Sequence, residues 1–278
     1  MMEPKTNRLF VVNKPLFISS NQYLGKIKKR YKNKKAGFSG TLDPFAKGCL
    51  IVAFGQYTKL FQFLKKTPKK YKATLFLGAY SETLDIEKIS KVEQIEKFSL
   101  EQVTKVIESF KGKITQIPPK YSAKRINGIR AYDLARQGID VDIKKIEVEI
   151  FNIKLTNYSH PFLSFEAEVS EGTYIRSLGR DISEKLGING SLTYLERINE
   201  GKFIFDNEKS LNPLEYLDLE KNSYLGDIEN LILGRKLSIN DFEKQDKGKY
   251  VVEFENYFAI IEIDENVKYL LNKVKKCW

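Results

Sequence analysis

The sequence is poor in the residue types on which many enzymes depend. It has two cysteines, Cys49 and Cys277, and a single histidine, His160, in 278 residues. Without a Cys/His cluster no zinc site can be assembled, so no metal is expected. The two cysteines are typical of a buried thiol and a tail thiol rather than of a disulfide. A Ser-His-Asp enzyme would have to use His160, a loop residue before Pro161, and we set that class aside.

Long apolar runs and nucleotide-binding loops are also missing. No uninterrupted apolar stretch is long enough to span a bilayer, and the N-terminus lacks the apolar segment of a signal peptide. We therefore expect a cytoplasmic protein without a membrane partner. Neither Gly-x-Gly-x-x-Gly after a strand nor Gly-x-x-x-x-Gly-Lys-[Ser/Thr] occurs. Nucleotide cofactors are thus unsupported, and the reaction should be one that side chains carry out without a cofactor.

Basic residues are in excess. Lys+Arg 47 against Asp+Glu 36 gives a net charge of +11. This predicts a polyanionic partner, because each lysine or arginine that meets a phosphate releases a counterion. The unmixed charge over 26–35 and the cluster over 65–72 favour phosphate contact over a merely solvated surface. The lysines expected to contact RNA phosphates are Lys28, Lys29, Lys34, Lys35, Lys69 and Lys70.

Apolar periodicity predicts an α+β protein with a mixed, largely antiparallel sheet. The expected strands are 9–12, 49–54, 71–77, 145–157, 163–170 and 191–197. The expected helices are 21–31, 56–64, 99–110, 131–137 and 173–186. Two apolar strands flank Glu255-Asn256, and 267–274 is a candidate third, which predicts a small β-rich C-terminal module. The expected domains are 1–212 and 213–278.

Asp43 lies in a loop of small and turn residues, immediately before Pro44. The commonest use of such an aspartate is as a helix N-cap, with the proline at the first helical position. The alternative is a carboxylate presented on a tight loop, acting as a nucleophile or general base. Local sequence favours the helix cap. A carboxylate beside bound phosphates is repelled by them, so its presence there would need a reason.

Two more positions have open alternatives. Tyr71 is either a strand tyrosine between solvated lysines or an aromatic face on which a base stacks. Arg176 can pair with Asp181 on the surface. If the start of its helix faces the loop, it can instead hold Asp43 by a charge-assisted, bidentate bond. None of these residues is decisive alone.

Six blocks of sequence stand in order between about residues 10 and 200. They are Lys14-Pro15 with Ser19-Ser20-Asn21; 37–48; Lys70-Tyr71 with Ser81-x-Thr83-x-Asp85; Pro118-Pro119-x-Tyr121-Ser122-Ala123 with Gly128, Tyr132 and Gly138; 172–178; and Leu195-x-Arg197. In this order the chain resembles the TruB family of tRNA pseudouridine synthases. The resemblance implies the pseudouridine synthase fold, with a cleft across a mixed sheet and a reduced, PUA-like C-terminal module.

The resemblance also implies a function. The chain would bind the T-arm of tRNA and isomerise the uridine at position 55 to pseudouridine by base flipping, without a cofactor. Asp43 matches the catalytic aspartate, which adds either at C1′ or at the base, and Arg176 matches its partner. Tyr71 matches the tyrosine that stacks on the flipped uracil and has been proposed to transfer a proton. Tyr174 and Leu195 match substrate-pocket positions. We expect a monomer.

Two positions depart from the family pattern. Phe38 stands where the family usually has a histidine that is associated with the rearranged T-loop, and Phe17 replaces a glycine of the first block. An aromatic ring stacks on a base but cannot hydrogen-bond to it, so Phe38 is expected to contact the substrate differently from the histidine.

Two alternatives to this function stay open at the level of sequence. One is a noncatalytic tRNA-binding protein or folding chaperone on the same scaffold, which would not require the Asp43–Arg176 pair. The other is a pseudouridine synthase with a different RNA target. The noncatalytic alternative is less favoured because both residues of the pair are present.

Overall fold

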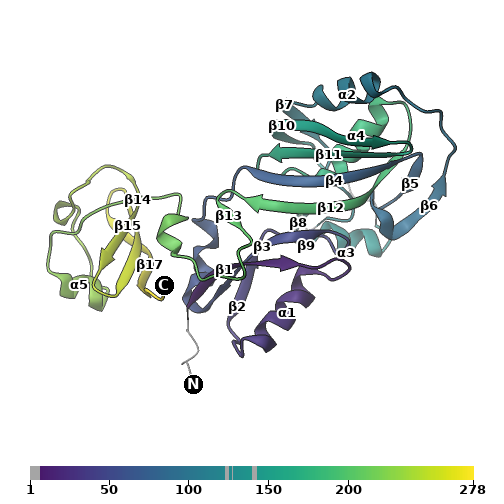
Figure 1. The fold of residues 1–278 in the computed structure, drawn as a ribbon. Coiled ribbons are helices and arrows are strands. Elements are labelled where there is room, and N and C mark those ends of the chain that lie inside the picture. Colours follow the sequence, from purple (N-terminus) through teal and green to yellow (C-terminus); the bar gives the residue numbers. More distant parts are fainter. Residues whose placement is uncertain (1–6, 123–124, 127, 140–142) are drawn as a thin grey trace.

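A large mixed sheet organises the chain, and a smaller sheet lies beside it (Figure 1). The computed structural model describes residues 7–278 except 123–124, 127 and 140–142, so Ala123 of the fourth block lies outside the described residues. Within the described ranges the large sheet has nine strands, in the order β1-β3-β12-β4-β11-β10-β7, with β2 beside β3 and β13 beside β12. The pair β3–β12 is parallel and the other neighbours are antiparallel, which confirms the α+β prediction.

The strands of this sheet come from the whole length between residues 8 and 204. Their bounds are β1 (Arg8–Lys14), β2 (Ala36–Ser39), β3 (Lys47–Phe54), β4 (Lys69–Leu77), β7 (Gly112–Gln116), β10 (Ile146–Ser159), β11 (Phe162–Val169), β12 (Gly190–Glu200) and β13 (Phe203–Ile204). Short ribbons outside the sheet are β5 (Ala79–Ser81) with β6 (Ile89–Val92), and β8 (Arg125–Ile126) with β9 (Ile129–Arg130).

Serine side chains cap the first two α-helices. Both α1 (Ser20–Arg30) and α2 (Leu100–Glu108) open with a capping box, in which a serine accepts from the backbone amide three residues on. The other α-helices are α3 (Ala131–Arg136), α4 (Ile175–Lys185) and α5 (Ile228–Leu233), and the 3-10 helices are η1 (Gly55–Gln62), η2 (Ile86–Lys88), η3 (Pro213–Glu215) and η4 (Ile239–Asp241). The expected helix over 56–64 is thus a 3-10 helix, and α4 begins two residues later than expected.

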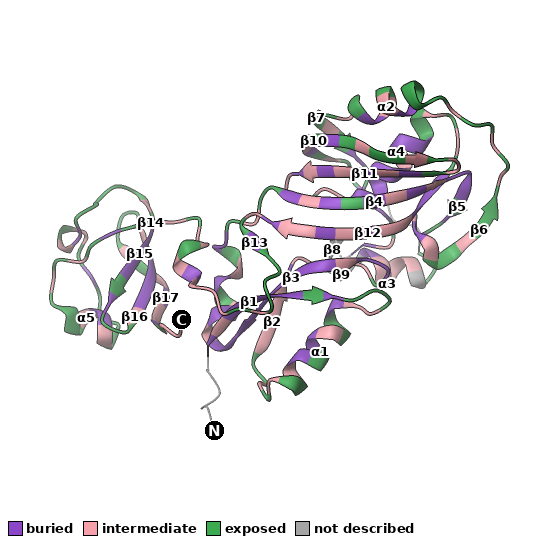
Figure 2. Cartoon of the chain, viewed as in Figure 1, coloured by how far each residue is buried: buried purple, intermediate pink, exposed green. Residues whose placement is uncertain are grey.

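The faces of the sheet are covered unequally, as the burial pattern shows (Figure 2). On β4 and β11, buried residues alternate with partly exposed ones. The buried rows of these strands form one core with α2 and α4. At β1 and β3 both faces are covered: one row packs on α1, and the other packs on η1 and the C-terminal sheet. The open face of β4 and β11 is lined with charged pairs.

The C-terminal strands form a separate sheet in the order β14-β15-β16-β17. Their bounds are β14 (Glu220–Lys221), β15 (Gly248–Phe254), β16 (Tyr257–Ile263) and β17 (Val267–Lys275). The hairpin around Glu255-Asn256 and the third strand are as expected. Trp278 returns to η1, with its ring centroid 6.4 Å from that of Tyr57. Because this sheet shares a core with η1, the domain division at 212/213 stays a prediction.

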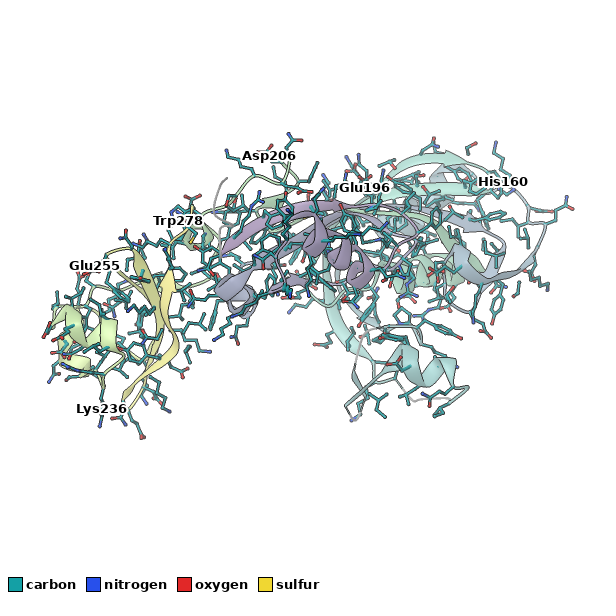
Figure 3. All side chains as sticks on the ribbon, turned by 90° about the horizontal axis from the view of Figure 1, so that it is seen from below. His160, Glu196, Asp206, Lys236, Glu255 and Trp278 are labelled. Atoms are coloured by element: carbon teal, nitrogen blue, oxygen red, sulfur yellow. The ribbon has the colours of Figure 1, made fainter. Side chains whose placement is uncertain are left out.

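His160 lies at the end of the molecule opposite Trp278 (Figure 3), where its ring is 3.3 Å from the Tyr158 hydroxyl. Cys49 and Cys277 are free thiols.

Over the described part of the chain, no helix is long and apolar enough to cross a membrane. No group of three or more metal-ligating side chains gathers among those same residues.

Candidate active site

Asp43 lies in the loop between β2 and β3. Pro44, Phe45 and Ala46 close a single turn, in which the Ala46 amide donates to the Asp43 carbonyl at 3.1 Å, and β3 begins at Lys47. The helix-cap interpretation of Asp43 is therefore wrong, because no helix follows it. Its side chain is 33% exposed and lines a cavity of about 370 Å³.

The N-terminal block holds this loop on one side. The Ser20 hydroxyl is 2.9 Å from both the amide nitrogen and the carbonyl oxygen of Leu42, the residue before Asp43. Lys14 is fully buried, and its ammonium donates to three carbonyls, including that of Pro44 at 3.3 Å. Burial lowers the pKa of Lys14 to about 8, although the nearby Asp43 carboxylate opposes that change.

Arg197 holds the loop on the other side. Its guanidinium is buried and donates to the carbonyls of Gly40, at 2.7 Å, and Cys49, at 2.8 Å. It also pairs with Glu200, which is fully buried, at 2.8 Å. The backbone approaches closely here: Gly40 and Gly48 both have positive φ, and a Cβ on Gly48 would lie 2.2 Å from the Arg197 carbonyl oxygen. Gly40 and Gly48 are thus required by their backbone conformation and by packing.

Arg176, from the first turn of α4, forms a bidentate ion pair with Asp43. Its Nε is 2.8 Å from Oδ2, and its Nη2 is 3.0 Å from Oδ1. Asp181 pairs with Arg180 instead, at 2.7 Å, so the alternative surface pair between Arg176 and Asp181 does not form. Two planar groups joined by parallel hydrogen bonds fix the direction of the carboxylate. The loop and α4 are therefore locked together at this point.

The Arg176 guanidinium is itself held in place by a buried polar cluster. It donates to the carbonyls of Thr83 and Tyr121, each at 2.7 Å, and its Nη1 is 3.5 Å from Asp85. Burial raises the pKa of Asp85, although the Thr83 hydroxyl and Arg176 oppose the rise. The sequence motif Ser81-x-Thr83-x-Asp85 contains both residues but predicts no role for them. Their two-residue spacing was the only available signal.

Tyr71 faces the cavity from β4. Tyr71 is 7% exposed, and its hydroxyl lies near the charges of the buried Arg197 and Glu200. Burial raises the pKa of Tyr71, so the phenol stays protonated at neutral pH. Lys69, two residues earlier on the same strand face, also lines the cavity. Its ammonium is 3.2 Å from Glu200.

Lys70 is not brought to the cavity. It lies on the opposite face of β4, where its ammonium is 3.4 Å from Glu166 and 3.8 Å from Glu168 on β11. Neighbouring residues of a strand point to opposite faces, so Lys69 and Lys70 cannot both face the cavity.

Tyr174 and Leu195 complete the cavity. Tyr174 is the residue before α4 and makes no side-chain cap bond, so its ring is free to line the cavity. Burial raises its pKa as well. Leu195 lies on β12, two residues before Arg197, the position that pairs with Tyr71, and is 5% exposed. The cavity thus combines one oriented carboxylate, two protonated phenols and an apolar wall.

Phe38 and the α1 lysines lie beyond this cavity. Phe38 lines a second cavity of about 670 Å³ on the other side of Asp43, and its ring packs against the core under α1. Lys29, Lys34 and Lys35 are exposed, and Lys28 is partly exposed. The structure therefore groups Asp43, Arg176, Tyr71, Tyr174, Leu195 and Lys69 in one cavity, with Phe38 in the adjoining one.

The chain is similar to known proteins over nearly its whole length. The family model described as TruB family pseudouridylate synthase (N terminal domain) matches residues 28–175. The chain is 56% identical over 272 residues to a tRNA pseudouridine synthase B of Campylobacter jejuni, covering 98% of this chain and 100% of that protein. It is 55% identical over 271 residues to that of a Sulfurovum strain, covering 97% and 98%.

Solved structures show the same fold. An H/ACA RNP bound to a substrate RNA containing 2′-deoxyuridine is similar with a TM-score of 0.65 at 18% identity, over 98% of this chain and 86% of that one. A Cbf5-Nop10-Gar1 complex gives a TM-score of 0.65 at 19% identity, over 99% and 85%. At these identities the similarity concerns the fold alone.

Proposed function

The chain belongs to the TruB family of pseudouridine synthases and is a tRNA pseudouridine synthase, and on this premise we propose that it isomerises the uridine at position 55 in the T-loop of tRNA. The reaction breaks the N1–C1′ bond, turns the uracil and joins C5 to C1′. C5 loses a proton and N1 gains one, so atoms and charge balance without a cofactor. The noncatalytic alternative is not retained, because the close relatives are named as enzymes.

The observation that carries the proposal is the bidentate Asp43–Arg176 pair at the cavity. A carboxylate fixed in direction at a cavity of nucleoside-like size is suited to act as a nucleophile, since its attack needs little reorganisation. Asp43 adds either at C1′ or at the base, and the same placement serves both. The pair also reduces the electrostatic repulsion between the Asp43 carboxylate and RNA phosphates, because the positive charge of Arg176 neutralises the carboxylate.

The proposal requires the base to leave its stack, because the carboxylate lies inside a cavity. Extruding a base costs a few kcal/mol. Stacking on the Tyr71 ring offsets part of that cost, on the order of 1–3 kcal/mol per base. Leu195 supplies an apolar wall, and the protonated hydroxyls of Tyr71 and Tyr174 can donate to the polar edge of uracil.

RNA phosphates supply the remaining binding energy. Lys28, Lys29, Lys34 and Lys35 form a basic surface on and after α1, whose N-terminus lines the cavity beside Asp43. Lys69 offers a cation at the first cavity. We leave Lys70 out of the proposed contact, because its carboxylate partners hold it on the other face of the sheet. A monomer that acts in the cytoplasm stays a prediction.

Mapping the product on an unmodified tRNA transcript tests the target position. We expect carbodiimide-adduct primer extension to show one new stop, at position 55, after incubation with the protein. A transcript with cytidine at position 55 is the matched control and should show none. Pseudouridine at another position would contradict the proposed target, and an unmodified transcript that is bound but never modified would contradict the activity.

A further inference from the structure

Two lysines and one glutamate form a charge cluster at the edge of the Asp43 cavity. Lys66 and Lys69 have side chains that are only 16% and 11% exposed, whereas the Glu171 side chain is 59% exposed. Glu171 and Lys69 both line the cavity. The cluster thus consists of two mostly buried cations under a solvent-accessible carboxylate.

Glu171 is the anion that both lysines share. One of its oxygens is 3.4 Å from the Lys66 ammonium and 3.9 Å from that of Lys69. Lys69 has a nearer partner in the buried Glu200, at 3.2 Å. Lys66 has no other ion-pair partner among the described residues, and its other polar neighbour is the Ser39 hydroxyl, at 3.4 Å. Lys66 therefore depends on an exposed side chain for its counter-charge.

Such a partner is easily exchanged. An exposed carboxylate gains little from an ion pair, because water and salt screen the attraction and the side chain loses rotamer freedom. A phosphodiester carries one negative charge, as Glu171 does, so it can replace the carboxylate without changing the net charge of the cluster. Glu200 stays in place, since it is fully buried between Lys69 and Arg197.

The cluster also lies where a nucleotide would bring its phosphate. Lys69 and Tyr71 are two residues apart on the same face of β4, so the ammonium lies next to the ring on which a flipped base would stack. Glu171 precedes Gly172, Thr173 and Tyr174, which line the same cavity.

We propose that Lys66 and Lys69 form a binding site for the phosphate of the nucleotide whose base enters the cavity, and that Glu171 occupies this site in the free protein and leaves it when RNA binds. The inference rests on the proposed function for the identity of the nucleotide. Glu171 then acts as a built-in competitor of the substrate phosphate. Its removal should strengthen RNA binding, and removal of Lys66 should weaken it.

Affinity measurements on Glu171→Gln test the proposal. Filter binding of an unmodified tRNA transcript should show a dissociation constant about threefold to tenfold lower than that of the wild type, because one phosphate no longer competes with a carboxylate. Glu184→Gln is the matched control: Glu184 is 67% exposed and lies 3.6 Å from Arg180, but it lies more than two turns along α4 from Arg176. Its dissociation constant should stay within about twofold of the wild-type value.

The salt dependence of RNA binding tests whether Lys66 contacts a phosphate. Lys66→Met should weaken binding and reduce the slope of log K against log salt by about 0.9, the change expected for one lost phosphate contact. In a Lys66→Met background, Glu171→Gln should gain much less than it does alone. Equal affinities for Glu171→Gln and Glu184→Gln, or an unchanged slope for Lys66→Met, would overturn the proposal.

Activity on the same transcript separates this proposal from the function on which it rests. If the wild type forms pseudouridine and Glu171→Gln binds no more tightly than Glu184→Gln, the phosphate site is wrong and the function stands. If the wild type forms none while Glu171→Gln still binds more tightly, the phosphate site stands and the function is wrong. Glu171 is exposed, so loss of folding does not confuse the comparison.

Discussion

The Ser20 hydroxyl ties the first helix to Leu42, the residue before Asp43. Its oxygen is 2.9 Å from the Leu42 amide nitrogen, from which it accepts, and 2.9 Å from the Leu42 carbonyl oxygen, to which it donates. Both Ser20 and Leu42 are buried. A single side chain thereby satisfies both backbone groups of the residue that precedes Asp43 in the loop.

Removing this hydroxyl should harm catalysis more than RNA binding. Ser20→Ala leaves two buried backbone groups of Leu42 without a partner, which costs about 1–3 kcal/mol of stability. A shifted Asp43 should lower kcat on the order of 10²-fold, with a smaller change in KM. Urea unfolding and single-turnover assays measure both effects. Ser19→Ala is the control, since it removes the helix cap, worth about 1 kcal/mol, without affecting the bonds to Leu42. Equal rate losses for Ser20→Ala and Ser19→Ala would contradict a specific role of Ser20 in placing Asp43.

The buried Lys14 should make stability depend on pH in the alkaline range. Its pKa falls from 10.5 to about 8 on folding. Between these values the unfolded chain holds the proton and the folded protein does not, so stability rises with pH over this window. The unfolding free energy of the wild type minus that of Lys14→Met should therefore become more positive from pH 8 towards pH 10, as measured by urea unfolding. A constant difference would show that Lys14 keeps the same proton in both states.

Gly40 should be intolerant of a side chain for a reason beyond its φ of +68°. A Cβ there would lie 2.7 Å from Glu200, in the network that holds the loop. Gly187 has a φ of +76° with nothing within 4 Å of a Cβ, so Gly187→Ala carries the backbone strain alone, about 1–2 kcal/mol. Gly40→Ala should lower the unfolding free energy, measured by thermal unfolding, more than Gly187→Ala does. It should also lower kcat. Equal costs for both variants would show that Glu200 moves away freely.

Two substitutions at Tyr71 separate its ring from its hydroxyl. Tyr71→Leu removes the stacking face and should weaken tRNA binding by about 1–3 kcal/mol. Tyr71→Phe keeps the ring but removes the proton donor beside Arg197, and it should lower kcat by about 10²-fold or more while binding is preserved. The measurements are filter binding and single-turnover rates. If Tyr71→Phe matches the wild-type rate, the hydroxyl has no part in proton transfer.

Local patterns predicted most of the elements. Ser19 and Ser20 indicated the start of α1, and Ser99 with Gln102 indicated the start of α2, because nearby side chains satisfy the free backbone amides of a helix start. The apolar alternation around Glu255 marked the C-terminal hairpin. These features depend on neighbours along the chain, which the sequence displays directly.

The site could not be derived in this way, because its contacts join distant segments. Asp43 and Arg176 are separated by 133 residues, and local sequence favoured a helix cap for Asp43. Only the resemblance of the ordered blocks placed the two together. Glu200 was missed because the pattern ended the strand at Arg197, whereas β12 continues to Glu200. The sequence alone does not distinguish a buried glutamate from an exposed one, because the partners Arg197 and Lys69 are brought to Glu200 by the fold.

Asp43 acts as the nucleophile in the proposed reaction, and single-turnover pseudouridine formation by Asp43→Asn is the decisive assay of that role. The amide keeps the size of the carboxylate but not its nucleophilicity, so the rate should fall on the order of 10⁴-fold or more. The dissociation constant for the transcript should stay within about threefold of the wild-type value, or decrease, because one negative charge near RNA is removed. Pseudouridine formed by Asp43→Asn at the wild-type rate would contradict the claim.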